Sequence, residues 1–286
     1  MESSLISAEK LTQMYAAMLK LRMASERPQL RKGLRRKPQP HFHEACQVGC
    51  TVDLRAEDTL FPLPTQHLQA LTTTASRSVE HPHTGTCSPS KHPEWPCVLN
   101  TDHFGQRVPF ATGAACLHRT QQKGNVVVAF VEDDEIRNDR ESLQLAHDHC
   151  LPIIFVLLER SRRTPSRRSR GRDQNQVTVI PVDQVDVVAV YRVCFEATDK
   201  ARRGAGPTVI HCLRTAHVSA HENSGRAESR DPLLHMELYL KKKGLWSDDF
   251  KRSIEENFLR EANHISGIAR TKRIAAADHT SESAQR

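Results

Sequence analysis

Acidic side chains follow directly after a strongly apolar stretch in the middle of the chain. Residues 126–131 read Val-Val-Val-Ala-Phe-Val, and the next four residues are Glu132, Asp133, Asp134 and Glu135. Carboxylate oxygens are the ligands that hard divalent cations such as Mg²⁺ prefer. The acidic run could therefore bind a metal. The commoner case, which we favour, is a solvated turn whose charges stabilise the N-terminus of a following helix.

Two apolar segments flank this acidic run and have the character of buried strands. Residues 126–131 form the first, and residues 151–158 read Leu-Pro-Ile-Ile-Phe-Val-Leu-Leu. Residues 138–149 between them have helical character, so together the segments predict a strand–helix–strand unit, which builds parallel sheets. Ligands of open parallel sheets bind beyond the carboxyl ends of the strands. The residues after 131 and after 158 are therefore expected at a ligand-binding edge.

Segments of similar character extend along most of the chain and predict an α/β fold. Apolar residues at helical spacing predict helices over 7–24, 45–54, 105–119, 183–203 (with Asp183 as its cap), 231–243 and 247–270. Apolar or β-branched runs predict strands within 58–64 and over 177–182 and 208–213. Residues 72–103 and 160–176 are predicted to be irregular loops. We expect one domain over 1–270 and a flexible tail over 271–286.

Composition narrows the class of protein only a little. The chain has 286 residues, 38% of them hydrophobic, and a formal net charge of +7, which suits an acidic partner without identifying one. No apolar run approaches the roughly 20 residues that span a bilayer, and the N-terminal residues show no charged segment followed by an apolar one. The eight cysteines are scattered. We therefore expect reduced thiols and a cytoplasmic location.

Two further patterns are weighed against plainer interpretations. Residues 160–172 contain seven arginines in thirteen positions, which could bind a nucleic acid through its phosphates, but no aromatic residue is interleaved for base stacking. A solvated loop is the favoured interpretation. Histidines and cysteines are dense between 41 and 118, yet they do not form the paired short spacings of a zinc site.

Eight segments in order along the chain resemble one protein family. They include residues 11–22, 44–49 and 53–62, then 105–114 (similar to a GAQ-x-P-x-A-x-GAA helix) and 151–156 (LP-x-IFV), and finally 182–191 (VDGNDVLAVY), 206–210 (GPTLI) and 230–232. The chain resembles the alpha subunit of the thiamine-diphosphate-dependent 2-oxo acid dehydrogenases. This subunit belongs to the decarboxylating first component of the pyruvate, branched-chain and acetoin dehydrogenase complexes.

The resemblance implies a thiamine-diphosphate-binding fold, in which helices flank a mostly parallel sheet. It implies pairing with a homologous beta subunit in an α2β2 heterotetramer, with thiamine diphosphate and Mg²⁺ bound between subunits. The family decarboxylates a 2-oxo acid and passes the acyl group to lipoamide, which is carried by a lipoyl acyltransferase core.

The resemblance also assigns candidate site residues. It places Asp133 at the Mg²⁺-binding aspartate of the family's GDG turn, with Glu132 and Gly105 in the cofactor-binding region. His67 and His221 are placed at two histidines near the active site of the family, the second only if one residue is inserted.

Several positions depart from the family pattern at this site. The GDG turn reads Glu132-Asp133-Asp134, an NN pair reads Glu159-Arg160, and a Tyr-Arg pair reads Pro64-Thr65. Guanidinium has no acceptor for a metal, and both glycines that would let the backbone approach the diphosphate are replaced. The charges at the two strand ends are expected to pair with one another instead.

We therefore predict a divergent paralogue in which binding of thiamine diphosphate and Mg²⁺ is weak or absent. The remaining role would be to pair with a beta-type subunit or with itself. One alternative is an active enzyme that decarboxylates a 2-oxo acid, and a second is a nucleic-acid binder that uses residues 160–172.

Overall fold

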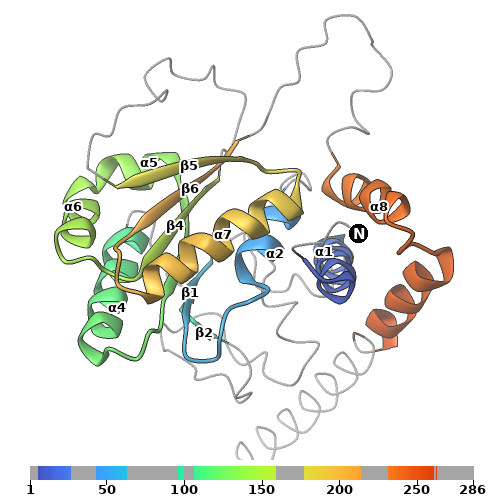
Figure 1. Ribbon diagram of the computed structural model, residues 1–286, viewed down its shortest axis with the longest axis horizontal. Helices are drawn as coiled ribbons and strands as arrows, with labels where there is room; N and C mark the ends of the chain where they lie inside the picture. Colours follow the sequence, from blue (N-terminus) through green and yellow to red (C-terminus); the bar gives the residue numbers. More distant parts are fainter. Residues whose placement is uncertain are drawn as a thin grey trace, which may run out of the picture.

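A parallel sheet forms the centre of the structure, which is a computed structural model (Figure 1). It describes residues 6–26, 43–62, 96–99, 106–158, 177–213, 231–260 and 262. Within these ranges six strands pair in the order β2-β1-β3-β4-β6-β5. Their bounds are β1 Thr59–Phe61, β2 Cys97–Val98, β3 Val127–Glu132, β4 Ile153–Leu158, β5 Thr178–Asp183 and β6 Thr208–Leu213.

Helices cover both faces of the sheet. Helices α4 (Arg107–Gln121) and α6 (Arg140–Asp148) pack on one face, while α2 (Glu44–Thr51) and α7 (Val187–Arg202) pack on the other. The short α5 (Asp133–Asn138) follows β3 directly. Helices α1 (Ala8–Glu26) and α8 (Pro232–Lys242), with a further helix over 248–260, form an additional layer beyond α2 and α7.

The two central strands are buried on both faces, which explains why their sequences are continuously apolar. In β3, Val127 and Ala129 face the α4 side, whereas Val128 and Phe130 face the α7 side. Side chains of a strand alternate between faces, so a strand covered by helices on both sides needs apolar residues at every position. The predicted strand–helix–strand unit is confirmed, since β3 pairs with β4 in parallel over its whole length.

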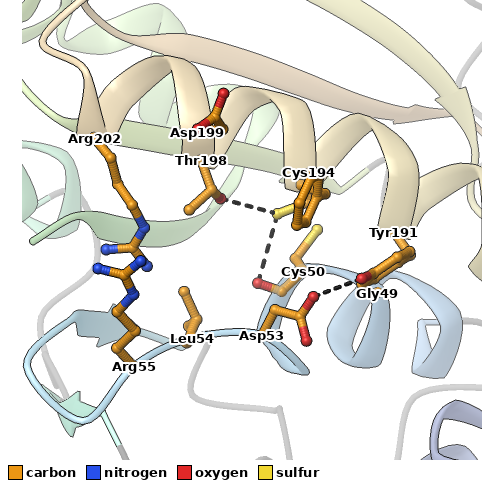
Figure 2. A pocket seen from close by; sticks show the side chains of 11 residues that line it. Gly49, Cys50, Asp53, Leu54, Arg55, Tyr191, Cys194, Thr198, Asp199 and Arg202 are labelled. Atoms are coloured by element: carbon orange, nitrogen blue, oxygen red, sulfur yellow. Dashed lines mark hydrogen bonds between the residues drawn. The ribbon is translucent and has the colours of Figure 1, made fainter. Parts of the chain in front are cut away.

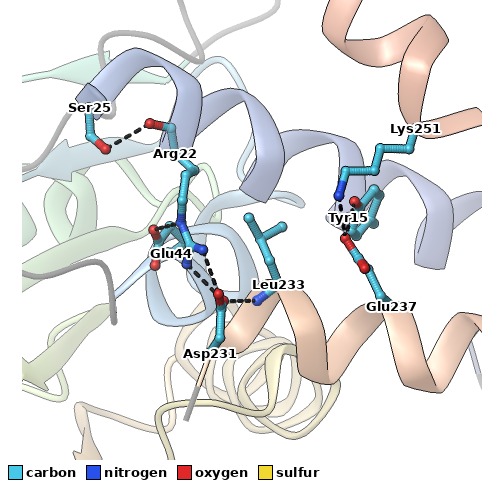
Figure 3. Close-up of polar contacts among 8 residues, drawn as sticks. All are labelled: Tyr15, Arg22, Ser25, Glu44, Asp231, Leu233, Glu237 and Lys251. Carbon is cyan, nitrogen blue, oxygen red and sulfur yellow. Dashed lines mark hydrogen bonds and ion pairs between the residues drawn. The ribbon is translucent and has the colours of Figure 1, made fainter. Parts of the chain in front are cut away.

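A charged cluster attaches the outer helical layer to α2 (Figure 3). The guanidinium of Arg22 in α1 donates from Nε to Glu44 at 2.9 Å and from Nη1 and Nη2 to the two oxygens of Asp231 at 2.8 and 2.9 Å. The same Asp231 caps α8 by accepting from the backbone N–H of Leu233. One arginine therefore connects α1, α2 and the start of α8.

A second buried cluster connects α7 to the amino ends of β1 and β3. Asp58, which precedes β1, is completely buried and accepts from the backbone N–H of Val126 at 2.9 Å. Both terminal nitrogens of Arg202, the last residue of α7, donate to the Asp58 carboxylate at 2.9 and 2.6 Å. This end of the sheet lies opposite the carboxyl ends, where a ligand was expected.

Three details differ from the predictions. The acidic run is not a turn, because Asp133, Asp134 and Glu135 form the first turn of α5. The cap of α7 is Asp186, whose carboxylate accepts from the N–H groups of the first turn, whereas Asp183 stays in the β5–β6 ladder. Residues 72–103 include a strand, since Cys97–Val98 pairs with β1 at the edge of the sheet.

The predicted tail (271–286) and the arginine-rich part of the predicted loop (160–172) lie outside the described residues. Among the helices that are described, none combines the length and apolar character needed to cross a membrane.

Candidate functional site

The acidic run lies at the edge of the sheet where ligands of such folds bind. Glu132 is the last residue of β3 and pairs with Leu158, the last residue of β4. The carboxyl ends of the two strands therefore meet, as the sequence predicted. Residues 159 and 160, which continue from β4, lie outside the described residues, so the predicted pairing of charges across the two strand ends stays a prediction.

Two of the acidic residues bond to each other's backbone and build the start of α5. The side chain of Glu132 accepts from the backbone N–H of Glu135, and Glu135 accepts from the backbone N–H of Glu132 at 2.9 Å. This reciprocal arrangement is a capping box, which satisfies N–H groups that the first turn of a helix leaves without partners. It explains why four consecutive acidic residues form a helical start and not an open turn.

Glu135 also forms a buried ion pair with the first residue of α4. Nη1 of Arg107 lies 2.8 Å from both carboxylate oxygens of Glu135, and the two side chains are only 1% and 4% exposed. Burial lowers the pKa of the Arg107 guanidinium, although the charges of Glu135 and Glu132 oppose that shift. Arginine nevertheless keeps its charge in proteins, so the pair places a fixed cation at this edge.

Part of the Arg107 guanidinium is not satisfied by this pair. Nε and Nη2 are buried and have no hydrogen-bond partner among the described residues. Buried donors without partners are costly, each by about 1–3 kcal/mol. Glu135 is therefore held strongly, because losing it would leave the whole guanidinium without a counter-charge.

Asp133, the predicted metal ligand, is bound to a cation on its own helix. Its carboxylate accepts from Nη2 of Arg137 at 2.5 Å, one helical turn away, and both side chains are about half exposed. Asp133 lies at the strand edge as predicted. Its role as a metal ligand stays a prediction, and Arg137 is the competing partner.

The charged residues described at the end of β3 can be compared with what a magnesium diphosphate needs. Mg²⁺ requires several oxygen ligands in near-octahedral geometry. Across the ranges that the structure describes, no group of three or more histidine, cysteine or acidic residues could hold a metal ion. At the strand edge Glu135 neutralises Arg107, and Asp133 is paired with Arg137. These residues fit each other better than they fit the cofactor.

The other predicted site residues cannot be placed beside this edge. His67, His221 and Gly105 lie outside the described residues, as do 64–65. Gly105 immediately precedes Gln106, the residue that begins α4. The predictions for these three residues are therefore not tested.

Arg107, which occupies the edge, is not among the site residues predicted from the sequence. A signal was present, because Arg107 precedes Ala111 and Ala115 by four and eight residues and so belongs to the face of α4 that packs on the sheet. A charged residue on a core-facing stripe needs a buried counter-charge. An acidic run at the neighbouring strand end was the obvious source.

A pocket of about 290 Å³ lies elsewhere, between α2 and α7 (Figure 2). Cys194 donates to the backbone oxygen of Cys50 at 3.6 Å, and Tyr191 donates to Asp53 at 2.6 Å. Arg202, which binds Asp58 at the amino end of the sheet, also lines the pocket. None of the predicted site residues does.

Comparison with known proteins agrees with the resemblance found in the sequence. Residues 12–277 match the family model described as "Dehydrogenase E1 component". The chain is 29% identical over 215 residues to the "2-oxoisovalerate dehydrogenase subunit alpha" of Bacillus subtilis, covering 62% of this chain and 64% of that protein. It is 26% identical over 275 residues to the "3-methyl-2-oxobutanoate dehydrogenase subunit alpha" of Mycobacterium tuberculosis, covering 82% and 70%.

A solved structure gives a weaker likeness. It is a putative thiamin diphosphate-dependent enzyme from Mycobacterium smegmatis, with a TM-score of 0.39 and 18% identity over 61% of this chain and 31% of that one. The family match, in contrast, extends over nearly the whole sequence. The chain therefore belongs to the dehydrogenase E1 component family and is related to the alpha subunits of 2-oxo acid dehydrogenases.

Proposed function

We propose that this chain is a divergent alpha-type subunit that binds thiamine diphosphate and Mg²⁺ weakly or not at all and has kept a role in subunit pairing. The observation that carries the proposal is the Arg107–Glu135 ion pair at the end of β3. The proposal is also supported by the departures from the family pattern at Glu132 and Asp134, where the family has glycines.

Electrostatics disfavour a diphosphate at this edge. A bound diphosphate needs cations that are free to face it, normally a metal ion or unpaired basic groups. Here the carboxylate of Glu135 already neutralises Arg107, while Glu132 and Asp134 add negative charge around it. Arg107 could face a diphosphate only if its buried ion pair with Glu135 were broken, which costs about 3–5 kcal/mol.

The ordered sheet and its helices support a role in pairing. Within the described residues, six strands form one sheet with helices on both faces, and Arg22 and Asp58 hold helices in place through buried or half-buried ion pairs. Alpha subunits of this family pair with beta subunits. The partner we propose is therefore a beta-type subunit or a second copy, with a lipoyl acyltransferase core as a further partner of the assembly.

Calorimetry tests the proposal directly. The full-length chain, alone and mixed with a beta-type subunit of the family, is titrated with thiamine diphosphate in the presence and absence of Mg²⁺. An alpha subunit with an intact GDG turn serves as the matched control. We expect metal-dependent binding by the control and at least 100-fold weaker binding by this chain. Equal, Mg²⁺-dependent affinities would overturn the proposal.

Retained catalysis is the alternative, and family membership alone favours it. It predicts that the chain, with a beta-type subunit, reduces an artificial electron acceptor when a 2-oxo acid is added. If Asp133 does bind the metal, Asp133→Ala should abolish that activity. No turnover with a panel of 2-oxo acids would agree with the degenerate site.

A further inference from the structure

Helix α4 exposes large apolar side chains on the side that faces away from the sheet. Phe110 and Leu117 are each 56% exposed, and Leu145 on the neighbouring α6 is 43% exposed. The opposite side of α4, with Val108 and Ala111, packs on the sheet. Among the described residues, helix α4 therefore has an exposed outer face as well as a buried inner one.

On the outer face of α4, residues of the same kind occur in the same order from either end of the helix. We call it the α4 stripe: Gln106, Phe110, Gly113, Ala114, Leu117 and Gln121. Successive spacings of 4, 3, 1, 3 and 4 residues keep the stripe on one face of a helix. About the midpoint between Gly113 and Ala114, a large apolar residue stands on each side and a glutamine stands beyond it.

This symmetric order fits an interface between two copies of the same helix. In a two-fold symmetric interface, residue i of one copy contacts residue j of the other, and j contacts i. Two α4 helices running antiparallel, with the axis beside Gly113, would place Phe110 of each copy on Leu117 of the other. Binding to a different protein would not require this symmetric order of residues in the stripe.

We propose that a second copy of this chain packs on the α4 stripe, with the two α4 helices antiparallel around Gly113. The inference deepens the pairing role proposed above by naming the surface and the partner. A Cβ added to Gly113 would meet no atom within 4 Å among the described residues, so the helix backbone is open to close approach there. Small residues at such a centre allow two helices to come together until the larger flanking side chains touch.

Charge is complementary in the same arrangement. Exposed Arg119 and Lys123 lie at or just beyond the C-terminal end of α4, while α5, with Asp133 and Asp134, packs beside its N-terminal end through the Arg107–Glu135 pair. Antiparallel pairing brings the basic end of one copy toward the acidic end of the other. The two helix dipoles are then also oppositely directed, which is favourable.

The area of the proposed interface indicates how strongly the dimer should associate. Stable interfaces bury about 1,200–2,000 Å² in total. One pair of 15-residue helices, flanked by Leu145 of α6, falls at or below the lower end of that range. The dimer should therefore dissociate on dilution and be measurable by sedimentation velocity across a wide range of protein concentration.

A matched pair of substitutions tests the surface. Phe110→Glu should weaken dimerisation at least tenfold, because it places a charge against the apolar Leu117 of the other copy. Phe195→Glu should leave it unchanged, because Phe195 is also 56% exposed but lies on α7, across the sheet. Circular dichroism establishes that both variants fold. A wild-type chain that stays monomeric at every concentration, or an equal effect of both variants, would overturn the proposal.

Charge complementation tests the partner. Gly113→Glu and Gly113→Lys should each be monomeric, since two like charges meet near the two-fold axis. An equimolar mixture of the two variants should dimerise again, because unlike charges then face each other. A mixture that remains monomeric while the wild type dimerises would overturn self-pairing through the α4 stripe. These measurements contain no cofactor, so their failure would leave the calorimetric test of the proposed function unaffected.

Discussion

Arg107 and Glu135 lie 28 positions apart in sequence, and a single guanidinium nitrogen of Arg107 is 2.8 Å from both oxygens of the Glu135 carboxylate. The contact joins the start of α4 to the first turn of α5 at the carboxyl end of β3. A charge pair within the chain therefore occupies the sheet edge at which related folds bind ligands.

Removing the acidic partner should destabilise the protein strongly. Glu135→Ala leaves Arg107 buried without a counter-charge, and we expect the free energy of unfolding to fall by about 3–5 kcal/mol. The double substitution of Arg107→Met with Glu135→Leu should recover most of that loss, because no buried charge remains. Urea titration measures both values.

Asp133→Ala is the control for that experiment. Its partner Arg137 is half exposed, so the ion pair is screened by water, and we expect a loss of at most about 1 kcal/mol. A loss as large as that of Glu135→Ala would contradict the assignment of the buried pair as the dominant contact.

Acid should loosen the contact between α1 and α8. Burial acts to raise the pKa of Asp231, but hydrogen bonds and charge from Arg22 outweigh it, so the pKa lies below its usual value. A carboxyl group with a lowered pKa contributes stability above its unfolded pKa of about 3.9 and loses that contribution as pH falls further. Hydrogen exchange of α8 should therefore accelerate below pH 4, and Asp231→Asn should remove this pH dependence.

His118 should make the protein less stable at mildly acidic pH. Burial lowers the pKa of His118, and the negative charge of Asp58 only partly offsets this shift. Nε2 of His118 is hydrogen-bonded to Thr59 Oγ1 at 2.8 Å. A histidine with a lowered pKa takes up its proton more readily when unfolded, so stability declines as pH falls below about 6.5. Between pH 7.5 and 5.5, His118→Gln should lose less stability than the wild type in denaturant titrations at each pH.

The buried thiols should react only when the protein opens. Burial and the neighbouring Cys212 raise the pKa of Cys46, and a hydrogen bond with Cys194 together with burial raises the pKa of Cys50. Thiolate is the reactive form, so both groups should be inert toward a disulfide reagent in the native protein. Cys150 is exposed. Replacing Cys150 with serine should remove one rapidly reacting thiol, whereas Cys50→Ser should leave the count of rapidly reacting thiols unchanged.

Local sequence patterns were enough to predict most of the helices and strands in their order. Continuous apolar runs predicted β3 and β4, and helical spacing predicted α1, α4 and α7, because these patterns depend on residues two to four positions apart. Ser7 and Asp231, which adjoin α1 and α8 in sequence, accept hydrogen bonds from the backbone of the first turn of these helices. The ordered motifs indicated the family, which the comparison confirmed.

Which charged residues contact each other depends on how the helices and strands pack. Asp183 and Asp186 are equally good caps by residue type, but pairing of Asp183 with Leu213 in the sheet leaves Asp186 to cap α7. The partner of Arg107 was likewise hidden, since four acidic residues follow β3 and only the capping box turns Glu135 inward. Packing brings together residues that are distant in sequence, and a buried charge is satisfied only by the group that packing places beside it.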